Sequence, residues 1–383
     1  MDLDACRQAF RRYTAETSEE EIQHYLEEEY KNKGLCHTLK LLEEWEYKTG
    51  YLTKEKLESN KRYEYFDKDI DVTFRAQVNF ARDKYTETVV GKDKEKKSVT
   101  QGDTEGSQRE EKEKKELHCK ICYENIGTPG KENLRVFSFD IGKKRPFFIQ
   151  LTPFPLFKRH FVLINREPVY MLMETQSVSD LVQFIEMAPG YVGCSNSDVE
   201  WAGASILVHH HYQVFDDLHL PIMDAGYIEA YRDEVTHAKS SLRIGILNYP
   251  IATCKLSCTD RDTFISVSGK IIEAWKAQMP GKNTCNLIVM KEKDEYTIYI
   301  MFRNPAHRTP EALTFIKSEG VGIIEAAGEG IYPVPKGELE KKAWDLIENH
   351  GLDVIKGIIE GNNPVEKEGI SGLYFFVRNL CTA

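Results

Sequence analysis

The sequence has no long hydrophobic run and fewer basic than acidic residues. No apolar stretch reaches the roughly 18 residues that a membrane-spanning helix needs, and the first residues contain no apolar segment of the kind that a secretory signal carries. The 51 Lys and Arg residues stand against 61 Asp and Glu, which gives a formal net charge of -10. A surface of this charge repels nucleic acid and anionic membranes. We therefore expect a cytoplasmic protein that binds neither, and an anionic substrate would need a local positive or backbone N–H pocket.

Cysteine is present in an odd number. The nine cysteines are spread irregularly over 383 residues, which argues against a disulfide framework and predicts reduced thiols in a cytoplasmic compartment. Cys254 and Cys258 are predicted to be thiols of the core. Cys119 and Cys122 form a lone C-x-x-C, which by itself is a weak zinc signal because a tetrahedral site needs four ligands.

The composition predicts a globular chain with a real core. Apolar residues make up 41% of the sequence, and its length allows two or three domains. Ser18 and Glu21 form a capping box that predicts a helix, and a second helix is predicted over 37–49. The charged segment 91–116 favours a flexible loop or a solvated helix over a docking segment. We divide the chain into a helical N-terminal region (1–90), the charged loop or helix (91–117), and two mixed blocks (118–235 and 236–383).

Short segments rich in β-branched and aromatic residues predict strands in both blocks. The predicted strands are 135–141, 146–151, 160–165 and 204–214 in the first block and 244–249, 286–290 and 296–303 in the second. Predicted helices cover 178–187, 227–239 and 262–277. Because the blocks are similar in size and strand content, we expect a duplicated α+β unit.

Three consecutive histidines carry the strongest chemical signal. An apolar run from Gly203 leads into His209, His210 and His211 and ends at Gln213. On a strand, side chains alternate between faces, so His209, His211 and Gln213 are predicted to share one face. An imidazole that is unprotonated near neutral pH can act as a nucleophile or as a metal ligand.

Other segments occur in the same order as in one known family. Residues 119–127 resemble its C-x-x-C-x-E-N-x-G motif, 133–135 its N-x-R, 150–154 its Q-x-S-P-Y and 317–325 its K-x-E-N-x-G-x-x-E. Together with His209-x-His211-x-Gln213 they span about residues 119–330. On these residues the chain resembles hexose-1-phosphate uridylyltransferases, most closely the Firmicutes-type galactose-1-phosphate enzymes of the histidine-triad superfamily.

The resemblance implies a fold and a reaction. The fold is α+β, with two histidine-triad-like half-domains of antiparallel sheets and flanking helices after a helical N-terminal region. The enzyme would be a nucleotidyltransferase of galactose and carbohydrate metabolism that exchanges a uridylyl group between sugar 1-phosphates. In it His211 would be the nucleophile, with one ring nitrogen donating to a backbone carbonyl, and His209 would belong to the same catalytic row. Gln213 would donate its amide N–H to a phosphate oxygen, as in an oxyanion hole.

The resemblance also implies contacts to the UDP-sugar and the sugar 1-phosphate, and ordinary structural roles remain open for several of the residues involved. Asp140 could instead be a solvated turn residue, Asn196 and Asp198 could form a turn, and Arg135 and Arg303 could be salt-bridge arginines. Helix-start chemistry around Glu319-Gly320 could equally explain Lys317 and Glu325. The substrate-binding candidates are Arg135, Asp140, Asn196, Asp198, Ser205, Arg303, Lys317 and Glu325.

A structural zinc is implied by the same family, although the exchange chemistry requires no cofactor. Its ligands here would be Cys119, Cys122 and His209. The family's middle histidine is replaced by Pro168, for which His160 or His118 could substitute. In related dimers the Lys-x-Glu segment can come from the partner subunit, which leaves a homodimer open.

Four departures from the family keep other interpretations open. Besides Pro168, His210 lies between the two histidines, Val214-Phe215 replaces a Gly-Gly pair, and a late His-Pro-His segment is missing. We interpret His210 and Val214-Phe215 as changes of pocket shape. The alternatives are a nucleotidyltransferase or phosphorylase of the same superfamily that acts on another NDP-sugar or sugar phosphate, and a nucleotide-binding protein without turnover.

Overall fold

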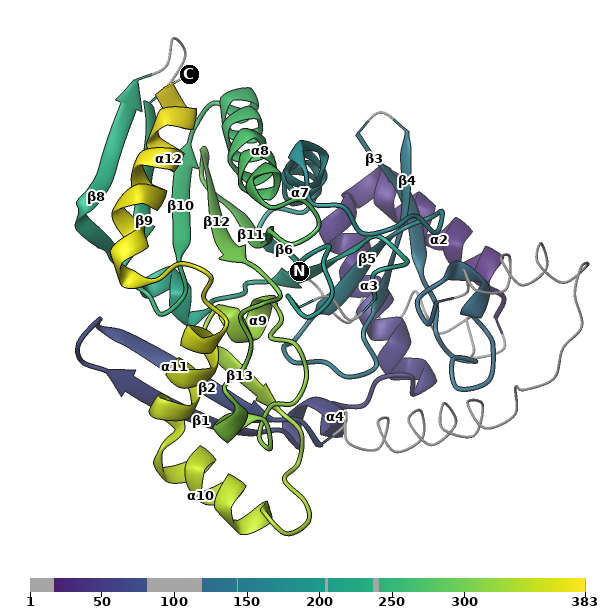
Figure 1. The fold of residues 1–383 in the computed structure, drawn as a ribbon. Helices are drawn as coiled ribbons and strands as arrows, with labels where there is room; N and C mark the ends of the chain where they lie inside the picture. Colours follow the sequence, from purple (N-terminus) through teal and green to yellow (C-terminus); the bar gives the residue numbers. More distant parts are fainter. Residues whose placement is uncertain (1–16, 81–118, 143, 204–205, 237–240, 383) are drawn as a thin grey trace, which may run out of the picture.

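One large antiparallel sheet organises the chain (Figure 1). The computed structural model describes residues 17–80, 119–142, 144–203, 206–236 and 241–382. Within these residues the sheet has ten strands in the order β3-β4-β5-β7-β6-β11-β12-β10-β9-β8. The two halves of the sheet repeat the same order of elements, because each is built from three strands, a helix and two more strands. The duplicated α+β unit expected from the sequence is therefore confirmed.

The halves meet at the centre of the sheet, where β6 pairs with β11. The first half comprises β3 (Phe137–Ile141), β4 (Arg145–Leu151), β5 (His160–Asn165), α7 (Thr175–Met187), β6 (Tyr191–Ser195) and β7 (His211–Asp216). The second comprises β8 (Tyr227–Thr236), β9 (Ser241–Leu247), β10 (Thr253–Cys258), α8 (Arg261–Gln278), β11 (Thr284–Glu292) and β12 (Glu295–Arg303).

Helices cover one face of the large sheet. Tyr212 and Val214 of β7 are buried on this face in a core shared with α7 and α8. In Figure 1, α12 lies over the strands of the second half, and the N-terminal helices lie beside the first half. These outer helices are α2 (Glu19–Lys33), α3 (Leu35–Thr49) and α12 (Ile370–Thr382). None of the helices that the structure describes is long and apolar enough to cross a membrane.

A small three-stranded sheet and short helices pack on the opposite face. Phe215 of β7 belongs to this second core, together with Tyr299 and Met301 of β12. The small sheet has the order β1-β2-β13, with β2 and β13 parallel. The elements on this side are β1 (Lys61–Asp67), β2 (Val72–Val78), β13 (Glu329–Tyr332), α4 (Lys54–Glu58), α9 (Ile323–Ala326), α10 (Glu340–Asn349) and α11 (Gly351–Gly361).

Two expectations about elements were wrong. The predicted helix 227–239 is strand β8, an edge strand that pairs with β9 and packs Tyr231 against Tyr374 of α12. The predicted strand 204–214 begins only at His211. Just before it, the backbone bonds to the 169–171 segment instead: the His210 N–H donates to the Val169 carbonyl at 2.6 Å. The region 1–90 is helical at first, as expected, but also contains the hairpin β1–β2. The charged segment 91–116 lies outside the described residues.

Buried carboxylates join the N-terminal helices to the large sheet. The capping box of Ser18 and Glu21 is present at the start of α2. From α3, Glu46 accepts the Arg135 backbone N–H at 2.8 Å, while its other oxygen has no hydrogen-bond partner among the described residues. Burial raises the pKa of Glu46 well above 4.5 and that of the neighbouring Glu19 to about 8.

We expect Glu46→Gln to stabilise the protein at pH 8. The unfolded carboxyl ionises near 4.5, so above that pH the folded state binds more protons and the free energy of unfolding falls as pH rises. A neutral amide at this position removes the loss of stability that comes with ionisation of the carboxyl. The increase in the free energy of unfolding of the variant over the wild type should therefore shrink as pH falls toward 4.5. Urea unfolding at pH 4.5, 6 and 8 measures it, with the exposed Glu28→Gln as control. An equal effect at all three pH values would contradict the prediction.

Candidate active site

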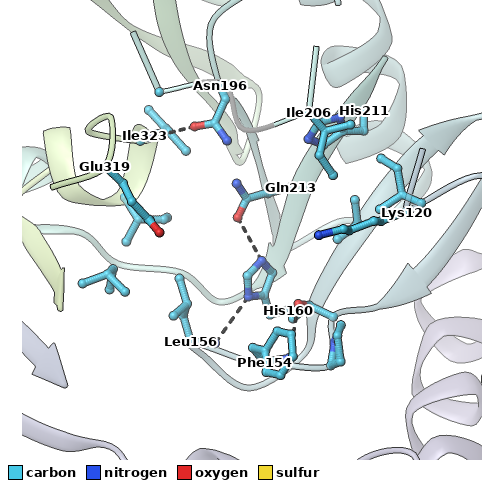
Figure 2. A pocket seen from close by; sticks show the side chains of 18 of the residues that line it. Lys120, Phe154, Leu156, His160, Asn196, Ile206, His211, Gln213, Glu319 and Ile323 are labelled. Atoms are coloured by element: carbon cyan, nitrogen blue, oxygen red, sulfur yellow. Dashed lines mark hydrogen bonds between the residues drawn. The ribbon is translucent and has the colours of Figure 1, made fainter. Parts of the chain in front are cut away.

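A cavity of about 690 Å³ opens on the face of the first half that carries His211 and Gln213. The two side chains share this face because they are two residues apart on β7. Figure 2 shows them with Asn196 and Ile323 on one side and His160 below Gln213. Five residues predicted from the sequence line the cavity: Asn196, His211, Gln213, Lys317 and Glu325.

His211 is held in one tautomer. Its Nδ1 lies 2.7 Å from the His209 carbonyl oxygen, and because a carbonyl only accepts, Nδ1 carries the proton. This is the backbone hydrogen bond expected from the sequence. Burial lowers the pKa of the His211 imidazole, so the ring is neutral near pH 7 and the lone pair is on Nε2. The side chain therefore offers a nucleophilic nitrogen at the cavity wall.

Gln213 lies next to His211 on β7, and its side-chain oxygen accepts a hydrogen bond from a residue on the neighbouring strand. Its Oε1 is 2.9 Å from Nε2 of His160, a buried histidine on β5 whose ring packs against Phe215 with centroids 4.4 Å apart. Burial lowers the pKa of His160 to about 4. His160 was considered from sequence only as a substitute zinc ligand, yet it lines the cavity.

The charged residues of the cavity wall come from different segments. Lys120 lies within the C-x-x-C loop and Lys131 follows it, whereas Glu200, Glu319 and Glu325 come from the segments that follow β6 and β12. Figure 2 shows Lys120 and Glu319 on opposite sides of Gln213. Sequence analysis missed both lysines, although it required a local positive pocket in this acidic chain. Their proximity to a cysteine pair was the available signal.

The two halves touch through glycine-containing loops at the edge of the cavity. Asn196 accepts the Ile323 backbone N–H at 2.9 Å, and Lys317 forms an ion pair with Glu325. At Gly203, which has φ +103°, a Cβ would lie 2.6 Å from the Val321 carbonyl oxygen. Only glycine permits both this conformation and this approach.

Four predicted substrate ligands lie elsewhere. Asp140 is exposed on β3, next to the β3–β4 turn. Arg135 donates to the Thr17, Glu132 and Leu134 carbonyls and so fixes the start of α2. Asp198 accepts from Met173 N–H and Thr284 Oγ1 and pairs with Lys276. Arg303 is buried and donates to the Val321 carbonyl at 2.9 Å. Ser205 lies outside the described residues.

Two departures from the family pattern affect the core and not the cavity wall. The Leu172 backbone N–H donates to Nδ1 of His210, so the proton of the neutral His210 ring is on Nε2. His210 Nε2 then donates to the Tyr212 hydroxyl at 2.7 Å. The Tyr212 hydroxyl in turn donates to Asp180. This chain runs toward α7. Val214 is buried in the core under the helices. Neither His210 nor Val214 lines the cavity, so the interpretation that these replacements change the shape of the pocket stays a prediction. Phe215 acts indirectly, by packing on His160.

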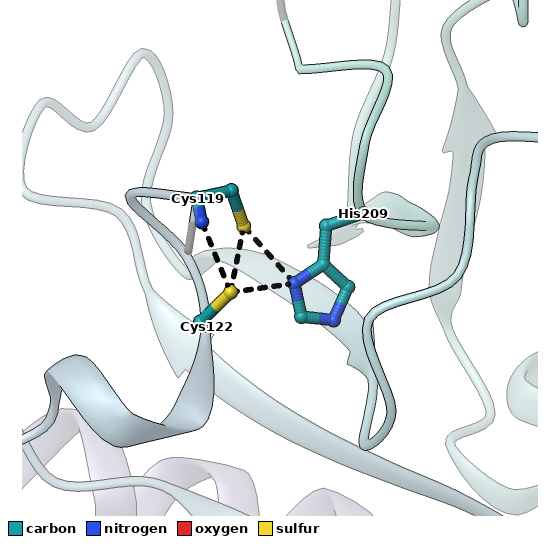
Figure 3. A group of neighbouring side chains, drawn as sticks. All are labelled: Cys119, Cys122 and His209. Atoms are coloured by element: carbon teal, nitrogen blue, oxygen red, sulfur yellow. Dashed lines mark hydrogen bonds between the residues drawn. The ribbon is translucent and has the colours of Figure 1, made fainter. Parts of the chain in front are cut away.

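His209 joins the cysteine pair (Figure 3). Its Nδ1 is 3.0 Å from Cys119 Sγ and 3.4 Å from Cys122 Sγ, and the two sulfurs are 3.1 Å apart. Its Nε2 donates to the Asn165 carbonyl at 2.8 Å, which turns the Nδ1 lone pair toward the sulfurs. A backbone acceptor on the second ring nitrogen is typical of metal-ligating histidines.

The three donors fit a zinc ion. Zinc lies about 2.3 Å from sulfur and about 2.0 Å from nitrogen, so the donors would move apart by less than about 1 Å. Burial, followed by the hydrogen bond to Cys122, raises the pKa of Cys119 to about 12, so a Cys119 thiolate here requires a cation. His160 is not a fourth ligand, because both its ring nitrogens are bonded elsewhere. His118 lies outside the described residues.

Three relatives identified by sequence comparison carry the same protein name. Galactose-1-phosphate uridylyltransferase of Caldanaerobacter subterraneus is 29% identical over 285 residues, 65% of this chain and 53% of the relative. The enzyme of that name from Clostridium acetobutylicum is 26% identical, and the match covers 60% of this chain and 51% of the relative. The one from Staphylococcus saprophyticus is 24% identical, and the match covers 78% of this chain and 64% of the relative. The chain thus spans about half the length of the first two. No protein-family model matches the chain.

Among solved structures, yeast Ap4A phosphorylase superimposes with a TM-score of 0.48 at 13% identity, covering 90% of this chain and 94% of the other. A second structure of that enzyme, in complex with Ap4A, gives a TM-score of 0.45 at 12% identity.

Proposed function

We propose that this chain is a nucleotidyltransferase that exchanges a uridylyl group between hexose 1-phosphates through a uridylyl-His211 intermediate. The observation that carries the proposal is the neutral, tautomer-fixed His211 beside Gln213 at the wall of a cavity. The curated relatives named galactose-1-phosphate uridylyltransferase support the choice of uridylyl group and hexose.

In the first half-reaction, Nε2 of His211 attacks the α-phosphorus of a UDP-hexose. A P–N bond forms, the P–O bond to the β-phosphate breaks, and hexose 1-phosphate leaves with the electron pair. The Nδ1 proton stays in its bond to the His209 carbonyl, which disperses the positive charge that develops on the ring. Gln213 donates an amide N–H to a non-bridging oxygen as negative charge grows there.

In the second half-reaction, the phosphate oxygen of another hexose 1-phosphate attacks the same phosphorus and the P–N bond breaks. No proton has to be abstracted, because the acceptor phosphate is already ionised. Gln213 is a neutral donor and cannot activate water as a general base. This supports transfer between sugar phosphates over hydrolysis.

The charge distribution across the cavity supports an orientation for the substrate. Lys120 and Lys131 would attract the phosphates on the side of the C-x-x-C loop. Glu319 and the paired Lys317–Glu325 on the other side would accept and donate hydrogen bonds to hexose hydroxyls. Figure 2 shows Asn196 above Gln213, on the same side of the cavity as Ile323 and Glu319.

We further propose that Cys119, Cys122 and His209 hold a structural zinc ion. When bound, the metal would stabilise the two thiolates and tie the C-x-x-C loop to the segment that precedes β7. Because His209 supplies the carbonyl that orients His211, this link would position the nucleophile while taking no part in the transfer.

Cys122→Ser is expected to abolish zinc binding and lower the melting temperature. Removing one of three protein donors leaves too few ligands for a closed site. Atomic emission spectrometry on purified protein, with thermal melts before and after chelation, measures both effects. Cys36→Ser, at a partly buried cysteine away from the cluster, is the matched control and should retain zinc. Wild-type protein with less than about 0.1 zinc per chain after zinc-supplemented expression would contradict the proposal.

The reaction itself is tested with UDP-glucose that carries radiolabelled α-phosphate. The native protein should retain label after denaturing electrophoresis, and addition of galactose 1-phosphate should release the label as UDP-galactose. A parallel panel of ADP- and GDP-sugars identifies the nucleoside: label from one of these alone would assign a different nucleotidyltransferase. Binding of UDP-glucose without label from any nucleotide sugar would refute covalent transfer.

A further inference from the structure

His160 is a buried polar side chain that directly contacts Gln213 on the cavity wall and that the reaction steps above do not use. Its Nδ1 lies 3.4 Å from the Leu156 backbone nitrogen, and its Nε2 lies 2.9 Å from Gln213 Oε1. Both bonds are drawn in Figure 2, where the Gln213 amide nitrogen points away from His160.

The backbone N–H of Leu156 decides the direction of this chain of bonds. A backbone N–H can only donate, so Nδ1 of His160 accepts and the proton of the neutral ring is on Nε2. Nε2–H must then donate to the oxygen of Gln213. The NH2 group of Gln213 therefore faces the cavity beside His211. The Leu156 backbone N–H, acting through His160, fixes which way the amide is oriented.

Several contacts hold His160 in place. Its ring packs on Phe215, the neighbour of Gln213 on the same face of β7. The preceding residue, Arg159, has φ +52°, a conformation that costs energy for a residue other than glycine. Arg159 is fixed there by Glu43 of α3 at 3.0 Å and by an ion pair with Asp216 at the end of β7.

We propose that His160 is a positioning residue: its Nε2–H holds the Gln213 amide so that the NH2 group, and not the oxygen, meets the phosphoryl group. The inference rests on the proposed nucleotidyl transfer. In the opposite orientation, Gln213 would turn its oxygen toward the negative charge of the transition state and oppose the reaction.

His160→Phe tests the proposal because it keeps a ring against Phe215 and removes the donor. We expect both half-reactions to slow about tenfold, the rate equivalent of one hydrogen bond, with KM for UDP-glucose changed less than threefold. His160→Gln places an amide N–H near the same point and should recover the rate to within threefold. Melting temperatures of the variants establish that they are folded.

A double-mutant cycle with Gln213→Ala separates positioning from a structural role. If His160 acts through Gln213, His160→Phe should change the rate less than twofold once Gln213 is alanine. Another tenfold loss in that background, or an unchanged rate in the single variant, would overturn the inference while leaving wild-type transfer intact.

Histidine 15N chemical shifts provide a readout that does not depend on activity. The His160 signals, assigned by their absence in His160→Gln, should show the Nε2–H tautomer. An Nδ1–H tautomer would overturn the inference even if no nucleotide sugar labels the protein, whereas absence of labelling alone would refute only the proposed reaction.

Discussion

Replacing His211 by alanine is expected to abolish uridylyl exchange. The variant lacks the nitrogen that forms the P–N bond, and no described neighbour on this face of β7 offers another nucleophile at the same point. Loss of a nucleophile usually costs on the order of 10⁴-fold or more. Two measurements check it: the steady-state exchange rate, and the amount of covalent label after a single turnover with radiolabelled UDP-glucose. Both should fall to background, while binding of UDP-glucose persists because Gln213 and the lysines remain.

The matched control is His219→Ala. His219 is an exposed histidine that pairs with Asp224 away from the cavity, so its removal should leave exchange and labelling unchanged. Exchange by His211→Ala at a rate near that of the wild type would disprove the assignment of the nucleophile. Label that persists on another histidine in the variant would do so as well.

Elements with strong local patterns could be predicted from the sequence. Strand β5 has the predicted bounds, 160–165, and α8 differs from prediction by one residue at each end. β-branched and aromatic runs mark strands, and a long amphipathic pattern with Asp260 as N-cap marks the helix. Strand β8 was missed because its many charged residues (Glu229, Arg232, Asp233 and Glu234) also suit a solvated helix. Only pairing with β9 and cover by α12 decide between the two structures.

Charged candidates were less predictable than His211 and Gln213, and His209 lies before the strand, against the cysteine pair, and not in their row. Arg135, Asp198 and Arg303 belong to types that bind phosphates or sugars, yet here they join segments far apart in the sequence. Asp198 illustrates the reason, since its partners Thr284 and Lys276 are about 80 residues away. No local pattern states whether a carboxylate will face a cavity or a buried amide. His211 and Gln213 were predictable because strand alternation alone places them on one face.

Gln213→Ala is expected to slow both half-reactions by roughly 10²–10³-fold, the usual effect of removing one oxyanion donor. The same phosphorus reacts in both steps, so the two rates should fall by similar factors. KM should change little, because the hydrogen bond strengthens mainly as charge develops in the transition state. Rapid-quench measurement of label uptake, and of its release by galactose 1-phosphate, gives the two rates separately.

Gln278→Ala provides the control for this substitution. Gln278 is an exposed glutamine at the end of α8, so the change removes the same amide without touching the cavity. Its rates should equal those of the wild type. A loss of less than about threefold in Gln213→Ala would mean that the amide does not contact the phosphate. A loss confined to one half-reaction would mean that Gln213 contacts the leaving or entering sugar phosphate and not the transferred group.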